Sequence, residues 1–223
     1  MNQIVYIWLK ICSLFPMYIL NLSAIKFSLF LRLIAYRKKV ILANLKNSFP
    51  GHSDAQLLKI KTLIYNHLGQ LIAEGIKAIS INDKEIEKRV EIVNPELVQT
   101  YLDQEKDVIM VLGHYGNWEW ALLATSKHFE QELVGIYKPL SSIFWDQKLK
   151  KIRAKFGATL ISMKDSYRYL IKHNNRPKII GIIADQTPSK DELNYWTNFL
   201  NQDTAVFLGT EKIAKKLNCP VIY

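Results

Sequence analysis

The stretch Asp107-Val-Ile-Met-Val-Leu-Gly-His-Tyr-Gly-Asn-Trp-Glu119 decides the fold and marks one candidate site. Its first half is a short apolar run that ends at Gly113, which is typical of a strand buried on both faces in a parallel sheet. His114 follows in the turn, and Asn117 is a good N-cap for a helix expected from 117 to about 126. The stretch therefore predicts a strand, a tight turn and a helix, with a histidine at the point where the strand ends.

The same alternation continues to the end of the chain. Apolar runs predict further strands at 133–137, 158–162, 178–184 and 220–223, and periodic segments predict helices at 141–156, 165–173 and 207–217. Strands alternating with helices predict an α/β fold, a central and mostly parallel sheet flanked by helices. Ligands of such sheets bind beyond the carboxyl ends of strands, and both His114 and Asp185 fall just past a strand end.

The N-terminal segment is apolar but interrupted by charges. Residues 4–35 contain Lys10, Lys26 and Arg32, and the longest charge-free run, 11–25, falls short of the roughly 20 residues of a membrane span. No compact basic region or small-residue cleavage site marks a signal peptide. We expect residues 1–35 to form a membrane anchor that lies in, or dips into, the bilayer interface. The alternative is a helix pair buried in a soluble core.

The charge balance favours an anionic partner. The formal net charge is +10, no acidic residue precedes Asp54, and residues 141–178 alone carry a net +8. Phospholipid headgroups, a phosphorylated lipid, an acidic carrier protein and nucleic acid would all fit. Because the cations are mostly lysines and no nucleic-acid-binding motif is present, we expect no nucleic-acid partner. The five histidines lack the spacing of metal ligands, so we expect no metal site.

His114 and Glu119 have the residue types and spacing of a general base and its partner. Glu119 falls in the first turn of the expected helix, from which its carboxylate can fold back towards the imidazole. Such a carboxylate would hold one tautomer and stabilise the imidazolium. The helix N-terminus would offer N–H donors to a developing oxyanion. The alternatives are a turn histidine without a role and a glutamate that only complements the helix dipole.

Several motifs, in order along the chain, carry a resemblance to a known family. They are Tyr36-Arg-Lys-Lys to Phe49-Pro50, His67 with Glu74, His114 to Glu119, Arg153 to Gly157, Ala184-Asp-Gln-Thr-Pro188, and Phe207-Leu-Gly-Thr followed by Cys219-Pro-Val. This ordered set resembles the bacterial lysophospholipid acyltransferase superfamily, in particular the lipid A late acyltransferases that transfer lauroyl and myristoyl groups. The His-x-x-x-x-Glu pattern at His114 is similar to the acyltransferase motif of that superfamily.

The resemblance implies a reaction and a site. The donor would be a fatty acyl thioester of acyl carrier protein or coenzyme A, acting as co-substrate without a further cofactor. The acceptor would be a hydroxyl of a lipid A-type glycolipid precursor. His114 and Glu119 would be catalytic, whereas Arg153, Asp185 and Asn117 would bind substrate, with Asp185 orienting Arg153 or the acceptor sugar. The implied location is the cytoplasmic face of the bacterial inner membrane, with membrane lipids and acyl carrier protein as partners.

Two other functions fit the same residues, and the chain departs from the family pattern at its C-terminus. An acyltransferase acting on a lysophospholipid or ornithine lipid would use the same pair of residues, and a basic membrane-binding protein without activity would have a similar charge. A serine hydrolase is disfavoured because no Gly-x-Ser-x-Gly stretch occurs. Members of the family continue beyond the Pro-Val strand, so we expect the acyltransferase domain at 36–223 to be C-terminally incomplete.

Overall fold

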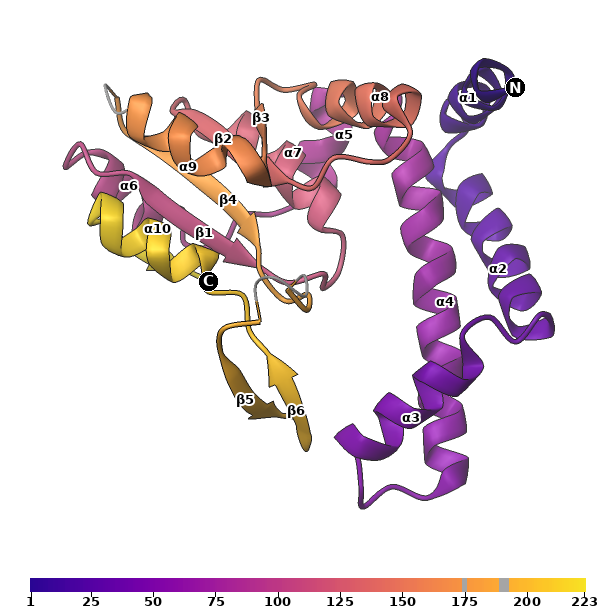
Figure 1. Cartoon of the computed structure of the whole chain (residues 1–223). Helices are drawn as coiled ribbons and strands as arrows, with labels where there is room; N and C mark the ends of the chain where they lie inside the picture. The colour runs from indigo at the N-terminus through magenta and orange to yellow at the C-terminus, as the bar shows by residue number, and fades with distance from the viewer. Residues whose placement is uncertain (174–175, 189–192) are drawn as a thin grey trace. The chain divides into compact units, whose positions relative to one another are not determined.

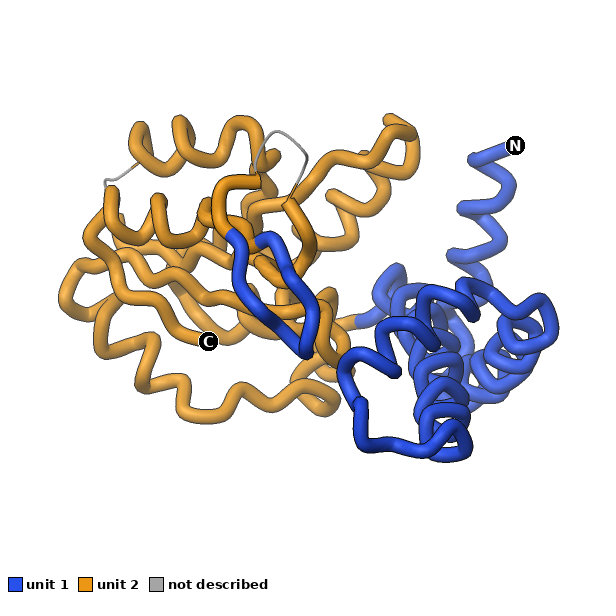
Figure 2. The backbone as a smooth tube through the Cα atoms, turned by 60° about the horizontal axis from the view of Figure 1, so that its bottom comes forward, with its two compact units in different colours: residues 1–81, 196–205 blue, residues 82–195, 206–223 orange. Residues whose placement is uncertain are grey.

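The computed structural model describes residues 1–173, 176–188 and 193–223, and it divides the chain into two compact units (Figure 2). The first unit comprises residues 1–81 and 196–205, and the second comprises 82–195 and 206–223. The first unit thus extends past residue 35 and takes in a distant segment of the chain.

The second unit is built on a five-stranded parallel sheet, which confirms the predicted α/β fold (Figure 1). The strand order is β3-β2-β4-β1-β7, so β4 lies between β2 and β1. The central strands are continuous apolar runs because both faces of the sheet are covered by helices. The strands are β1 (Val108–Leu112), β2 (Glu132–Tyr137), β3 (Thr159–Ser162), β4 (Lys178–Ile183) and β7 (Val221–Ile222).

Two groups of buried side chains, one on each face of the sheet, form the core of this unit. Successive residues of β1, such as Val108 and Ile109, belong to opposite groups. One group includes residues of α6 and α7, and the other includes residues of α9 and α10. The helices of the unit are α5 (Asp83–Arg89), α6 (Glu96–Leu102), α7 (Trp118–His128), α8 (Ile143–Arg153), α9 (Met163–Lys172) and α10 (Gly209–Leu217).

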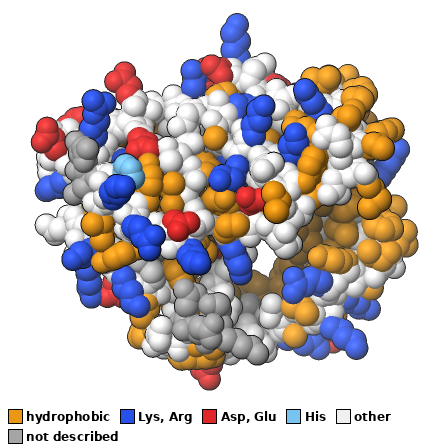
Figure 3. Space-filling view, turned by 45° about the horizontal axis from the view of Figure 1, so that its top comes forward, with side chains coloured by type: hydrophobic (Ala, Val, Ile, Leu, Met, Phe, Trp, Pro, Cys, Tyr) orange, Lys and Arg blue, Asp and Glu red, His pale blue; other side chains and the backbone are white. Residues whose placement is uncertain are grey.

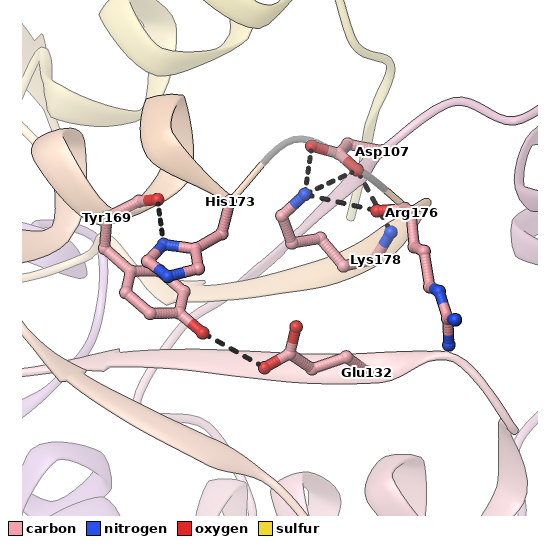
Figure 4. Close-up of polar contacts among 6 residues, drawn as sticks. All are labelled: Asp107, Glu132, Tyr169, His173, Arg176 and Lys178. Atoms are coloured by element: carbon pink, nitrogen blue, oxygen red, sulfur yellow. Dashed lines mark hydrogen bonds and ion pairs between the residues drawn. The ribbon is translucent and has the colours of Figure 1, made fainter.

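A buried ion pair joins β1 and β4 at the amino-terminal end of the sheet, opposite to the end that carries His114 (Figure 4). The side chains of Lys178 and Asp107 are only 1% and 6% exposed. Lys178 Nζ donates to the two Asp107 oxygens at 3.1 and 3.0 Å and to the Arg176 carbonyl at 3.3 Å. The backbone N–H of Lys178 also donates to Asp107 Oδ1 at 3.0 Å, so both charges have good partners.

The first unit consists of four helices and a β-hairpin. Ser53 and Gln56 form a capping box at the start of the long helix α4. Helix α2 packs along α4, and both Ser28 and Arg32 contact the side chain of Asn66. The elements are α1 (Asn2–Ser13), α2 (Met17–Leu33), α3 (Lys38–Ser48), α4 (Asp54–Ala78), β5 (Trp196–Phe199) and β6 (Gln202–Ala205). The sequence had not led us to expect the antiparallel pair β5–β6.

Helices α1 and α2 expose apolar side chains that no other part of their unit covers. Pro16 separates the two helices, which fall within the expected anchor segment. Figure 3 shows hydrophobic side chains gathered on the side of the view where these helices lie. Among the described residues, no single helix has the length and apolar character to cross a membrane, although α2 and α3 together do, across a bend of 92°. The exposed apolar residues are Ile4, Val5, Ile7, Trp8, Ile11, Leu14 and Phe15 of the first helix and its end, and Tyr18, Leu22, Ile25, Leu29, Phe30 and Leu33 of the second.

Candidate functional site

The strand order brings together two residues that lie 71 positions apart in the sequence. Strands β1 and β4 are neighbours, with Leu112 opposite Ile183, and the backbone N–H of Ala184 donates to the Leu112 carbonyl at 3.1 Å. His114 and Asp185 each follow their strand by two residues. The carboxyl ends of parallel strands share one edge of the sheet, so the two side chains meet there.

Asp185 holds His114 through two hydrogen bonds. The Nδ1 atom of the ring lies 2.6 Å from Asp185 Oδ1, and the backbone N–H of His114 donates to Oδ2 at 2.6 Å. A Cβ atom at position 113 would lie 3.2 Å from the same Oδ2, which favours glycine there. A carboxylate at Nδ1 fixes the tautomer with its proton on Nδ1, and leaves a lone pair on Nε2.

The protonation of Asp185 fits this arrangement. Partial burial raises the pKa of the Asp185 carboxyl, but hydrogen bonds from the His114 ring and backbone lower it further, and the net pKa is below its ordinary value. The carboxylate is therefore ionised at neutral pH.

The expectation that Glu119 folds back onto the imidazole was wrong in its geometry, because the carboxylate at the ring belongs to Asp185.

The other side of the imidazole faces Gln186 and Trp118. The side-chain nitrogen of Gln186 lies 3.3 Å from His114 Nε2, and the Trp118 ring packs edge-on against the imidazole with centroids 4.6 Å apart. These contacts fix the plane of the ring. In the sequence, the signal for Gln186 is its place beside Asp185 in the motif Ala184-Asp-Gln-Thr-Pro188.

Glu119 instead binds Arg153. The Arg153 Nε and Nη2 atoms donate to the two Glu119 oxygens at 2.8 and 2.5 Å, which is the bidentate geometry of a strong ion pair. The pair connects the first turn of α7 to the last residue of α8. The Arg153 guanidinium also lies 6.0 Å from the centre of the Tyr137 ring. Arg153 is thus oriented by Glu119, and not by Asp185 as one of our two hypotheses had it.

Asn117 caps α7, as the sequence predicted. Its side-chain oxygen accepts the backbone N–H of Trp120 at 2.9 Å. Gly116 precedes it with φ of +60°, a conformation that glycine adopts without strain. The cap and the turn together set the direction in which α7 leaves the sheet edge.

A cavity of about 1560 Å³ lies within the second unit and contains the site. His114, Glu119 and Arg153 line it at the carboxyl edge of the sheet. Other lining residues lie on the α7-covered face of the sheet, where Gly135 and Gly181 are paired on adjacent strands. The remaining lining groups include apolar side chains, among them Met110, Leu122, Leu133 and Leu160, and a set of lysines, Lys138, Lys164, Lys212, Lys215 and Lys216.

This arrangement can remove a proton from a hydroxyl beside an apolar cavity with a cationic lining. The site combines a tautomer-fixed imidazole, an Arg–Glu pair and the N-terminus of α7. No curated protein sequence matches the chain. A family model described as bacterial lipid A biosynthesis acyltransferase matches residues 2–223, nearly the whole chain. The chain therefore belongs to the bacterial lipid A biosynthesis acyltransferase family.

Proposed function

We propose that the protein transfers a fatty acyl group from an acyl thioester to a hydroxyl of a lipid A-type glycolipid precursor at a membrane. The observation that carries the proposal is the Asp185–His114 pair, in which the Nδ1 atom of His114 lies 2.6 Å from the carboxylate and His114 lines the cavity. A histidine with its lone pair on Nε2 can act as a general base. The transfer needs no cofactor besides the thioester itself.

The reaction follows from the proton that Nε2 can accept. His114 Nε2 removes the proton of the acceptor hydroxyl as its oxygen attacks the thioester carbonyl carbon. The backbone N–H groups in the first turn of α7 and the positive end of its dipole stabilise the oxyanion. The C–S bond then breaks, the acyl group stays on the acceptor oxygen, and the thiolate takes the proton back from the imidazolium. Asp185 stabilises that imidazolium.

The apolar part of the cavity suits the fatty acyl chain. Gly135 of β2 pairs with Gly181 of β4, and the row continues to Leu160 on one side and Met110 on the other. Leu122 packs over Gly135, whereas a Cβ atom at Gly181 would have its nearest neighbour, Leu133, at 3.8 Å, so we propose that the chain lies beside Gly181. A long unbranched hydrocarbon gains about 0.8 kcal/mol for each methylene that it buries. A fatty acyl thioester therefore fits the cavity better than a small polar donor would.

The cations of the cavity suit an acceptor that carries phosphate. Arg153 lies in the last turn of α8 with its guanidinium fork occupied by Glu119, and five lysines line the cavity besides. We expect Arg153→Lys to lower activity while keeping the charge, because an ammonium group cannot form the two parallel hydrogen bonds. A wild-type rate of transfer in that variant would show that Arg153 has no role in the reaction. We also propose that Asn117 binds substrate, in addition to capping α7.

The N-terminal helices suit a membrane surface. The exposed apolar side chains of α1 and α2 accompany cations that include Lys26, Arg37 and Lys38. Amphipathic and basic segments of this kind bind the interface of an anionic bilayer. We propose that the protein acts at the cytoplasmic face of the bacterial inner membrane, where acidic acyl carrier protein would deliver the donor.

The deciding experiment compares membranes that carry the wild-type chain with membranes that carry His114→Ala. Labelled acyl carrier protein is the donor, and an under-acylated lipid A precursor is the acceptor. We expect transfer by the wild type and a loss of at least about 10²–10⁴-fold in the variant. Equal rates in the two would refute the role of His114.

Parallel reactions identify the acceptor and donor classes. Lysophospholipid and ornithine lipid replace the glycolipid in two of them, and acyl coenzyme A replaces the carrier-bound donor in a third. Acylated product from another lipid, with none from the glycolipid, would support the proposed reaction but identify a different acceptor. Transfer to no acceptor, with the folded chain bound to the membrane, would favour a binding protein without activity.

A further inference from the structure

We propose that the β5–β6 hairpin is a membrane-contacting element, in which Trp196, Phe199 and Leu200 enter the headgroup region of an anionic bilayer. The inference rests on the membrane association proposed above. It adds a second contact, more than a hundred residues from the N-terminal helices in sequence but part of the same compact unit.

The hairpin exposes large apolar side chains to an unusual degree. Trp196, Phe199 and Leu200 are 56%, 60% and 48% exposed. A two-stranded hairpin is at best marginally stable alone in water, so side chains of this size are normally packed against something. The one acidic residue of the hairpin is Asp203. Tryptophan and other aromatic residues are enriched where a protein meets the headgroup region of a bilayer.

Hydrogen bonds hold the hairpin tip against the end of α3. The side chain of Asn201 donates to the Asn47 carbonyl at 3.0 Å, and the Asn47 side chain donates to Gln202 Oε1 at 3.0 Å. Leu200 and Asn201 form the turn, both with positive φ. Helix α3 begins with Lys38 and Lys39 and carries Lys46 in its last turn. The apolar tip is therefore fixed to a cationic helix, the combination that an anionic interface binds.

The charge of the whole unit selects this partner over a second copy of the chain. Residues 1–81 and 196–205 contain ten Lys or Arg and three Asp or Glu, a net +7 of the +10 for the chain. Two such surfaces would repel each other, whereas anionic headgroups neutralise them. Salt would weaken the electrostatic part of the binding but leave the apolar part intact.

A fluorescent label on the hairpin tests the contact directly. In the full chain, with Cys12→Ser and Cys219→Ala, an environment-sensitive dye is attached to Phe199→Cys. The matched control places the same dye at Leu97→Cys, an exposed apolar position of α6 in the other unit. Vesicles contain phosphatidylglycerol or phosphatidylcholine alone, and quenching by doxyl-labelled lipid is compared with quenching by aqueous iodide.

On phosphatidylglycerol vesicles we expect the dye at position 199 to be quenched by the lipid-borne doxyl group and shielded from iodide several-fold, and the dye at 97 to show neither change. Iodide quenching at 199 equal to that at 97, on chains that float with the vesicles, would overturn the hairpin proposal and leave membrane association standing. Chains that do not float at all would refute both. If the dye at 199 is shielded in the absence of vesicles, and the shielding increases with protein concentration, the hairpin mediates self-association, which also overturns the proposal.

A pair of substitutions measures the contribution of the hairpin to binding. We expect Trp196→Ser with Phe199→Ser to lower the partition coefficient onto phosphatidylglycerol vesicles about tenfold, which corresponds to about 1.4 kcal/mol. Val93→Ser with Leu97→Ser removes exposed apolar side chains elsewhere and should leave it unchanged. Equal coefficients for the two double variants would refute the assignment.

Discussion

Replacing Asp185 with asparagine tests which carboxylate orients the general base. Asp185 accepts hydrogen bonds from the ring and the backbone N–H of His114, both at 2.6 Å. An asparagine keeps one oxygen, which the backbone N–H still reaches, but it presents an NH₂ group to Nδ1. The ring must then accept a bond at Nδ1 and carry its proton on Nε2, the atom that has to receive the acceptor's proton.

The expected loss is large because the wrong tautomer removes the base itself. The corresponding substitution in a serine-protease triad lowers kcat about 10⁴-fold, or about 5.4 kcal/mol of barrier. We expect Asp185→Asn to lower kcat by about 10³–10⁴-fold with little change in KM. Glu119→Gln keeps one oxygen for Arg153 but loses the charge and turns an NH₂ group towards the second Arg153 nitrogen; for a net loss of about 1.4 kcal/mol we expect about a tenfold drop in activity.

Both variants are assayed beside the wild type, with initial rates of acyl transfer at several donor concentrations. Thermal unfolding of each sample confirms that it is folded. The reasoning is refuted if Glu119→Gln loses more activity than Asp185→Asn, because the carboxylate that matters would then be Glu119. It is also refuted if Asp185→Asn stays within tenfold of the wild type.

Three further predictions concern stability, chain length and pH. Lys178→Met should destabilise the chain by about 3–5 kcal/mol in denaturant unfolding, because it leaves the Asp107 charge buried and unpaired, and adding Asp107→Asn should recover most of the loss. Gly181→Val should disfavour long acyl donors over short ones by about fourfold for each methylene excluded, measured by competition between donors, and equal losses for all donors would contradict this use of the cavity. The pKa of Asp185 is lowered in the folded chain, so its bonds to His114 stabilise the fold at neutral pH. That contribution is lost as the pH falls from about 4, the ordinary pKa of an aspartate, through the lower pKa of the folded state. The difference in unfolding free energy between the wild type and Asp185→Ala should therefore shrink over that range.

The sheet could be predicted from sequence because its strands are buried on both faces. Runs such as 108–112 and 179–183 are apolar without alternation, and polar segments separate them from the helices. The helix after His114 could also be predicted, since Asn117 is its cap. What these signals leave open is the order of the strands across the sheet, which depends on packing between segments distant in sequence.

The strand order explains the error at the site. His114 and Glu119 are close in sequence, so a local interpretation paired them. Only the insertion of β4 beside β1 brings Asp185 to the imidazole, and no local pattern encodes that neighbour. Arg153 then becomes the partner of Glu119.

The hairpin β5–β6 escaped prediction for a different reason. Its sequence, Trp-Thr-Asn-Phe followed by Leu-Asn and Gln-Asp-Thr-Ala, mixes polar and aromatic residues without a clean alternation. Its turn uses Leu200 and Asn201 at positive φ, where a glycine would have been the recognisable signal. The position of these strands depends on their contacts with α3.

The position of β4 in the sheet also constrains how the chain can be made. Strands β1, β2 and β3 leave the ribosome first, but β1 and β2 pair with each other only through β4, which is synthesised later and fits between them. Until then both strands present unpaired edges, the feature that promotes aggregation of incomplete chains. Contacts this distant in sequence also slow folding. The general base and its carboxylate come together in the same late step, so a nascent chain cannot acquire its chemistry before the centre of its sheet is closed.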